Sequence, residues 1–173
     1  MIETDRLILR SWQPDDVMAF AEMNKDEEVM RYLPKCLSFD ETMLFYNRII
    51  EEHASKGYGL YVVELKADKS FIGYTGFHGF DFDVYFAPGV EIGWRLVKKH
   101  WNKGYATEAA KACLDYACSN RMFSEVYSFT AVCNYPSQRV MQKIGMNHIG
   151  FFSHPLLPQN HPLKEHTLYK LKL

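Results

Sequence analysis

A strand-like segment that leads through a glycine turn into an alanine-rich helix constrains the fold of this chain more than any other feature. Residues 90–97 form an apolar and aromatic run typical of a strand. Small apolar residues recur at helical spacing over residues 105–117, and Gly104 lies between the two segments. The first N–H groups of a helix have no partner within it and lie at the positive end of its dipole, so this turn predicts an anion site made of backbone.

The glycine turn does not match the two best-known nucleotide-binding loops. The segment Trp101–Thr107 lacks the GxxxxGK[ST] spacing of a P-loop and the GxGxxG spacing of a dinucleotide-binding fold. A lone loop glycine is also common at strand-to-helix connections that bind nothing. On spacing alone, both a simple turn and an anion site of another kind stay open.

The other patterns predict an α/β fold of the α+β type, with a mixed sheet and one domain over residues 1–173. Strands are expected over residues 6–12, 59–65, 71–77, 90–97, 125–132, 146–152 and 167–171. Helices are expected from residue 14, over 26–32, from Ser38 or Asp40 onward, over 105–117 and over 137–144. The expected order is β-α-α-β-β-β-α-β-α-β-β.

Three of these elements carry more detailed expectations. Leu7 and Leu9 lie on one side of the first strand, which is expected to be well buried, and Arg6, Ile8 and Arg10 lie on the other side. The apolar stripe of the helix that begins at Ser38 or Asp40 is expected to consist of Met43, Leu44, Ile49 and Ile50. Gly145 follows the last helix and is expected to end it in the left-handed conformation.

Length and charge narrow the class of protein. A domain of 173 residues buries roughly 70% of the surface of its unfolded chain, so it needs no metal or disulfide to fold. The 20 basic and 21 acidic residues nearly cancel and form no long run of one sign, which disfavours nucleic acid as a partner. No run of 18 apolar residues and no basic signal peptide occurs, so we expect a cytoplasmic protein without a membrane partner.

The cysteines and histidines predict no metal site. The four cysteines form no CxxC pair and are expected to be reduced thiols. His148, His154, His161 and His166 are spaced by six, seven and five residues, which matches no common set of metal ligands. They are interpreted as solvated loop residues.

Several motifs together resemble the GNAT acetyltransferases, and in particular the branch that includes the ribosomal-protein N-acetyltransferases. The similarity runs from the opening TDRLILR through VEIGWRL and WNKGYATEA to NYPSQRVMQKIGM, which is nearly the whole chain. It implies a twisted, mostly antiparallel sheet flanked by helices, and acetyl-CoA as the cosubstrate. The pyrophosphate pattern of the family, Gln/Arg-x-x-Gly-x-Gly/Ala, falls on Trp101, Gly104 and Ala106, so the first position departs from the consensus.

The resemblance implies that backbone groups do most of the cofactor binding. The turn of Trp101, Asn102, Lys103, Gly104, Tyr105, Ala106 and Thr107 would hold the pyrophosphate, and the departure at Trp101 leaves its backbone N–H groups intact. In the family, the strand that corresponds to residues 90–96 parts from its neighbour and pairs with the pantetheine arm as a sheet edge does. Main-chain donors near Trp94 and Leu96 would also polarise the thioester carbonyl.

Four residues are candidates for side-chain roles. Asn134 resembles the family residue that contacts the cofactor arm, and Ser137 matches a position near the thiol, where it could protonate the departing thiolate. Serine at a helix start is also a routine N-cap. Tyr135 is a second candidate donor, or a core or rim aromatic. Glu91 is the candidate general base, acting directly or through water, although it could equally be a structural strand residue.

Further candidates near the site are weaker. His78, Asp81 and Asp83 lie near the end of the preceding strand and are alternative bases. Aromatic residues of 80–86, with Trp12, Tyr32 and Phe39, are candidates for an acceptor pocket or for the core.

The predicted function is transfer of the acetyl group of acetyl-CoA to a primary amine by direct attack in a ternary complex. The acceptor is either a protein N-terminal amine or a small-molecule amine, and a homodimer paired through the C-terminal strands is an open hypothesis. The alternatives are a non-catalytic module with the same fold, which binds acyl-CoA or a partner, and an interaction protein without any cofactor. No covalent intermediate is expected, because no cysteine lies in a setting that would activate it.

Overall fold

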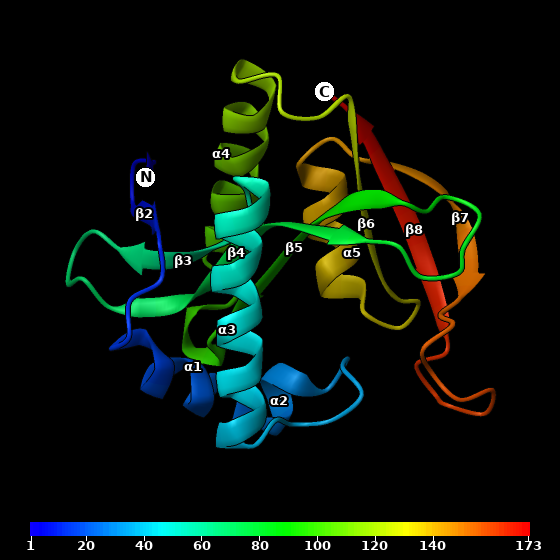
Figure 1. The fold of residues 1–173 in the computed structure, drawn as a ribbon, viewed down its shortest axis with the longest axis horizontal. Coiled ribbons are helices and arrows are strands. Elements are labelled where there is room, and N and C mark those ends of the chain that lie inside the picture. The colour runs from blue at the N-terminus through cyan, green and yellow to red at the C-terminus, as the bar shows by residue number, and fades with distance from the viewer.

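The computed structural model describes all 173 residues and contains one eight-stranded sheet with the strand order β1-β2-β3-β4-β5-β6-β8-β7 (Figure 1). Every neighbouring pair is antiparallel except β5 and β6. The strands are β1 (Ile2–Glu3), β2 (Leu7–Arg10), β3 (Leu60–Leu65), β4 (Phe71–Phe80), β5 (Gly89–Leu96), β6 (Glu125–Ala131), β7 (Asn147–Ser153) and β8 (Glu165–Lys172). The predicted mixed sheet of an α+β fold is therefore confirmed.

Three helices precede β3 and two follow β5. They are α1 (Asp16–Lys25), α2 (Glu27–Met30), α3 (Phe39–Lys56), α4 (Tyr105–Ser119) and α5 (Tyr135–Lys143), and a 3-10 turn spans Lys98–His100. Ser38 begins α3 with a reciprocal capping box to Glu41, as one of the two sequence-based alternatives predicted. No helix combines the length and the apolar composition that a membrane crossing requires.

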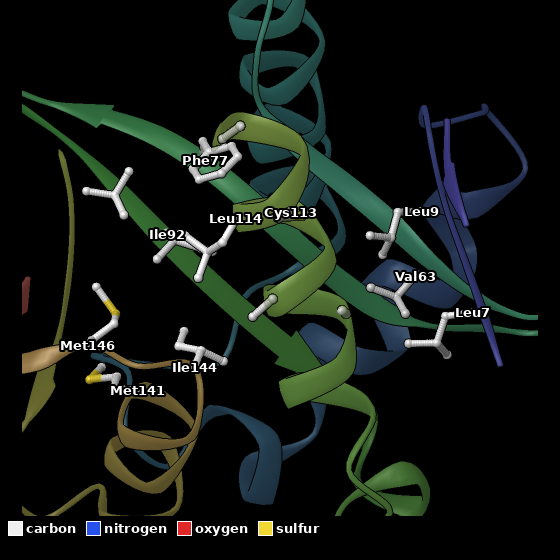
Figure 2. Packing of buried hydrophobic residues seen from close by; sticks show 14 of the residues in the cluster. Leu7, Leu9, Val63, Phe77, Ile92, Cys113, Leu114, Met141, Ile144 and Met146 are labelled. Atoms are coloured by element: carbon white, nitrogen blue, oxygen red, sulfur yellow. The ribbon is translucent and has the colours of Figure 1, made fainter. Parts of the chain in front are cut away.

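The two faces of the sheet are covered by different helices. Helices α4 and α5 pack on one face, where alternate strand residues such as Leu7, Leu9 and Ile92 meet Cys113 and Met141 in the main core (Figure 2). Helices α1 to α3 cover the other face, and Figure 1 shows α3 in front of the sheet. Val62 and Val63 are both fully buried on opposite faces, because successive strand side chains alternate.

The C-terminal part of the sheet has a separate aromatic core. Phe80 and Phe86, at the two ends of the loop after β4, pack with Tyr127 of β6 and Phe152 of β7. These phenylalanines were candidates for an acceptor pocket, but they fill the space under the loop. Trp12 is also a core residue, since its indole N–H donates to the Leu60 carbonyl at 2.8 Å inside the protein.

Several expectations about the elements need correction. The expected order omitted the short strand β1 and had only two helices before β3, whereas all three of the helices expected there from the local patterns occur. The apolar stripe assigned to α3 was wrong at Leu44 and Ile50, which are 64% and 39% exposed. Ile49 is buried as predicted, and Thr42 and Glu52 are buried with it, because the side of α3 that faces the sheet and α1 carries polar residues as well as apolar ones.

Strands β5 and β6 part soon after they meet. Glu91 and Tyr127 form the one registered pair between these two strands, although each strand continues for several residues. The remainder of β5 pairs only with β4, from Gly73 opposite Leu96 to Phe80 opposite Gly89. One edge of β5 from Ile92 onward is therefore left without a strand beside it.

Candidate functional site

The turn before α4 has the backbone conformation that an anion site needs. Gly104 lies in the left-handed region at φ 82°, and no side chain caps the N–H groups at the start of α4. Asn102 is also left-handed, at φ 59°, a conformation that asparagine adopts more readily than most residues. The turn therefore leaves the first N–H groups of a 15-residue helix free.

Trp101 joins this turn to the end of β5. Its indole N–H donates to the Leu96 carbonyl at 2.7 Å, and the ring packs between the two cores on either side of the sheet. Trp101, at the first position of the family pattern, therefore holds the turn against β5. Its indole N–H is used in this contact and is not available to an anion at the turn.

Arg6 holds the turn from the opposite side. Its guanidinium donates to the Lys103 carbonyl at 3.0 Å, pairs with the carboxylate of Glu108 at 2.6 Å, and lies 4.5 Å from the centre of the Tyr105 ring. The Thr4 hydroxyl donates to the same carboxylate at 2.5 Å. Glu108 in the first turn of α4 is thus neutralised by the N-terminal segment and does not repel an anion at the turn.

His100 adds a buried polar group beside the turn. It is 7% exposed, and neither ring nitrogen has a hydrogen-bond partner. Burial lowers the pKa of His100, and Lys99 and Lys103 lower it further. A neutral imidazole with an unused donor and an unused acceptor therefore lies next to the candidate anion site.

The free edge of β5 presents backbone groups at Trp94 and Leu96. The Val97 N–H donates to the Ile72 carbonyl at 2.9 Å, which makes Val97 and Ile72 a hydrogen-bonded pair of the antiparallel ladder. In such a ladder the bonding direction alternates from residue to residue, so Trp94 and Leu96 direct their N–H and C=O groups away from β4. That side faces the gap where β6 has diverged, although the Leu96 carbonyl already accepts from Trp101.

A cavity of about 380 Å³ opens beside this gap, on the face of the sheet that α2 and α3 cover. Its residues come from α2 and α3 and the segment after α2, from β3 to β6, and from the start of α5 (Figure 1). Of the sequence-predicted site residues, the cavity brings together Glu91, Trp94, Asn134 and Ser137, with the weaker candidates His78 and Tyr32.

Glu91 is the acidic group of this cavity that has no partner. It lies opposite His78 in the register of β4 and β5, and its carboxylate forms no ion pair or hydrogen bond. Burial raises the pKa of Glu91 to about 8, and no neighbouring charge contributes to this shift. An added Cβ on Gly93 would meet Oε1 of Glu91 at 4.0 Å and nothing closer, so the strand leaves space next to the carboxyl group.

Glu52 and His78 form a second polar group in the same cavity. Glu52 accepts from His78 Nδ1 at 2.5 Å, and from Lys56 and the Gly79 N–H at 2.9 Å each. Burial alone would raise the pKa of Glu52, but hydrogen bonds from Lys56, Gly79 and His78 hold it below its usual value. The charge of Glu52 is therefore already compensated.

Asn134 and Ser137 both line the cavity, and Asn134 is the residue that caps α5. Asn134 is the N-cap of α5, with its side-chain oxygen accepting from the Ser137 N–H at 3.3 Å and its amide donating to Thr130 at 2.9 Å. The capping interpretation of Ser137 is therefore wrong, because the helix begins at Tyr135 and not at Ser137. The Ser137 hydroxyl lines the cavity and has no hydrogen bond within the protein.

Other candidates lie away from the cavity. Tyr135 is 66% exposed and does not line it, and Asp81 and Asp83 are exposed in the loop after β4. Phe39 is 50% exposed at the start of α3. The predicted turn residues Asn102 and Lys103 are exposed, whereas Tyr105, Ala106 and Thr107 are half-buried in the first turn of α4.

Three residues of the site escaped the sequence reasoning. Arg6 was assigned only to the polar side of the first strand, His100 was not considered, and Arg95 was quoted only as part of a motif. A basic run, Lys98-Lys99-His100, directly before the turn was the available signal for His100. No local pattern pairs Arg6 with a turn about 100 residues later.

Comparison with known proteins places this architecture in a family. Residues 6–147 match the family model described as the acetyltransferase (GNAT) domain. The uncharacterized N-acetyltransferase YnaD of Bacillus subtilis is 35% identical over 153 residues, which are 87% of this chain and 85% of YnaD.

Solved structures agree with that match. An acetyltransferase of the GNAT family from Bacillus anthracis is 30% identical and superposes with a TM-score of 0.81 over 99% of this chain and 97% of its own. The ribosomal alpha-N-protein acetyltransferase RimL, solved in complex with coenzyme A, is 15% identical with a TM-score of 0.80 over 98% and 96% of the two chains, and this likeness shows the fold alone. On these matches, this chain belongs to the GNAT family of acetyltransferases.

Proposed function

We propose that the protein transfers the acetyl group of acetyl-CoA to a primary amine by direct attack within a ternary complex. The observation that carries this proposal is a juxtaposition at one strand. The edge of β5 that β6 leaves free runs from the cavity with Glu91 to the uncapped turn before α4. A long cosubstrate with a phosphate end and a reactive thioester end fits such an arrangement.

The turn before α4 is the proposed pyrophosphate site. The free N–H groups of residues 102–107 would bind the phosphate oxygens, with the exposed Lys103 adding charge and the buried His100 a hydrogen bond. The free N–H and C=O groups of Trp94 would pair with the amide-rich pantetheine arm, as an added strand does. Asn134 would contact that arm from α5.

Three groups are proposed to act on the reacting atoms. The amine nitrogen forms a bond to the thioester carbonyl carbon while the carbon–sulfur bond breaks, and main-chain N–H groups at Trp94 and Leu96 stabilise the developing oxyanion. Glu91 takes the proton that the amine loses, directly or through water. A carboxyl group with a pKa near 8 suits this role, because it is partly ionised at neutral pH and still basic enough to accept a proton.

Ser137 is the proposed proton donor to the departing thiolate. Its hydroxyl lines the cavity and has no partner within the protein, so it is free to bond to the sulfur. The exposed Tyr135 is kept as the second candidate. The reaction as proposed needs no metal ion and no covalent enzyme intermediate.

We also propose a branch of the family and two classes of acceptor. The sequence motifs WNKGYATEA and NYPSQRVMQKIGM favour the ribosomal-protein N-acetyltransferase branch, and RimL, which shares the fold, has a name that specifies a protein α-amine. A small-molecule amine is the other candidate, since one fold serves many acceptors. A homodimer paired through the C-terminal strands stays a prediction, which sedimentation of the purified protein can test.

The experiment that tests the proposal combines binding with turnover. Calorimetric titration with acetyl-CoA should give saturable binding to the protein, and a panel of amines and N-terminal peptides should give amine-dependent thiol release. Gly104→Val should weaken acetyl-CoA binding strongly, because valine is strained at φ 82° and its Cβ would lie 3.4 Å from Nη2 of Arg6, which holds the turn. Normal binding by this variant would overturn the placement of the turn, and binding without turnover would favour the non-catalytic alternative.

A further inference from the structure

The wall of the cavity contains an arginine that no acidic group neutralises. Arg95 of β5 is half-buried and lines the cavity on the same side of the strand as Glu91 and Gly93. Its one hydrogen bond within the protein goes from Nη1 to the side-chain oxygen of Asn24 at 2.6 Å. The arginines that form ion pairs with carboxylates are Arg6, Arg10 and Arg31.

A second arginine lies on the same aromatic ring. The guanidinium of Arg48 is 5.5 Å from the centre of the Phe45 ring, and that of Arg95 is 6.0 Å from it. Arg95 also lies 5.2 Å from the centre of the Tyr74 ring. Arg48 lines the cavity as well and forms no ion pair. Aromatic faces hold both cations in place, but they leave most of the guanidinium N–H donors without an acceptor.

The acidic groups of the cavity do not balance these two cations. Glu52 is already hydrogen-bonded to Lys56 and His78. Glu91 is kept largely protonated at neutral pH by burial, and Arg95 does not contribute to its pKa. The cavity beside the thioester position thus has a net positive charge, located on the side of Arg48 and Arg95.

The spacing along β5 links this charge to the proposed chemistry. Glu91 and Arg95 are four residues apart, so their Cα atoms lie about 13 Å apart along the strand. Gly93 lies between them and leaves the intervening wall open. A short molecule whose amine is at Glu91 can therefore present a second group to the guanidinium of Arg95.

We infer that the acceptor is a primary amine that also carries a carboxylate, which Arg95 binds with the help of Arg48. A guanidinium fork matches a carboxylate in a bidentate geometry, and such charge-assisted hydrogen bonds are strong in a partly buried site. This inference rests on the proposed function for the position of the amine. The carboxylate belongs either to a free amino acid or to an acidic residue near the N-terminus of a peptide.

The test uses acceptors that differ in this charge, and each pair is compared at equal concentrations of the free amine, because an α-carboxamide also lowers the pKa of its amine. Thiol release is measured for pairs of a carboxylate and its carboxamide: glycine and glycinamide, 4-aminobutyrate and 4-aminobutyramide, 6-aminohexanoate and its amide, and tripeptides with glutamate or glutamine at the third position. The wild-type protein should favour the carboxylate of at least one pair by about 10- to 100-fold in kcat/KM, the range for one hydrogen bond to a charged group. The preferred pair identifies the source of the carboxylate.

Arginine variants then locate the preference. Arg95→Gln should bring the ratio of carboxylate to carboxamide close to one, Arg48→Gln should reduce it less, and Arg95→Lys should restore only part of it. Arg121→Gln, which removes an exposed arginine outside the cavity, is the matched control and should keep the wild-type ratio. The ratio within each variant does not depend on the fraction of folded protein, so a loss of stability cannot imitate the result.

The outcomes separate this inference from the proposed function. Equal turnover of both members of every pair by the wild-type protein overturns the inference and leaves the proposed function intact. Calorimetry of the same pairs with the coenzyme A-saturated protein gives a second readout. Carboxylate-selective binding without thiol release would support the arginine site and refute the catalytic proposal, and unselective or absent binding would overturn the inference.

Discussion

The substitution Glu91→Gln should stabilise the protein and inactivate it at the same time. Glu91 lies in the cavity without an ion pair or hydrogen bond, and burial raises its pKa from 4.5 to about 8. Glutamine has nearly the shape of the protonated carboxyl group but cannot ionise. The variant therefore removes one titration and leaves the packing unchanged.

The magnitude follows from the two pKa values. Between pH 4.5 and 8 the unfolded chain has lost the proton of Glu91 and the native protein has kept it, so the native state binds more protons and its stability falls as pH rises. At pH 7 the difference corresponds to about 2.5 pH units, or about 3 kcal/mol. The free energy of unfolding of the variant should exceed that of the wild-type protein by this amount at pH 7, and by almost nothing near pH 4.

Urea denaturation of both proteins between pH 4 and pH 9 measures this difference. The gap between the two curves should widen up to about pH 8 and then stay constant. Thiol release by the variant should fall by at least 100-fold, since general base catalysis contributes at least that factor. Parallel stability curves would refute the raised pKa, and unchanged turnover would refute the role of Glu91 as the base.

Substitutions at four further positions test other parts of the site. Ser137→Ala should lower kcat by about 100-fold without a change in melting temperature, whereas Asn134→Ala should lower the free energy of unfolding by about 0.5–2 kcal/mol, because Asn134 is the cap of α5. Arg6→Gln should raise the Kd for acetyl-CoA by about 2- to 5-fold in calorimetry, and Arg6→Lys should not restore it, since lysine lacks the fork that holds the Lys103 carbonyl and Glu108. Gly93→Val should raise the acceptor KM by about tenfold and leave the melting temperature unchanged, because an added Cβ has space and valine suits a strand. Unchanged kinetic and binding constants in these variants would contradict the assigned contacts.

Local patterns were enough to predict most elements of the fold. The alternation at Leu7 and Leu9 and the glycine turn at Gly104 depend on neighbours in sequence, and the structure has β2 and α4 where these patterns indicated them. The stripe on α3 was wrong at Leu44 and Ile50, because which side of an amphipathic helix is buried depends on what lies opposite. Thr42 faces the buried Asn24 of α1, and Leu44 faces outward.

The site was predictable where one short segment builds it. The turn of residues 101–107 could be located from sequence alone. Contacts between distant segments could not be predicted in this way. The clearest cases are the ion pair of Arg6 with Glu108 and the hydrogen bond from Arg95 to Asn24. Of the two alternatives for Ser137, capping was wrong because α5 starts at Tyr135, two residues before the expected start, with Pro136 in its first turn. The catalytic and binding roles of these residues stay predictions.

Initial-rate kinetics with both substrates varied tests the central claim most directly. Thiol release is measured over a grid of acetyl-CoA and amine concentrations, with mass spectrometry of the acetylated amine as the product check. Direct attack in a ternary complex predicts intersecting lines in double-reciprocal plots and one acetylated amine for each thiol released. Parallel lines would indicate a covalent acetyl-enzyme and contradict the direct mechanism, and the absence of amine-dependent thiol release would contradict the acetyltransferase activity itself.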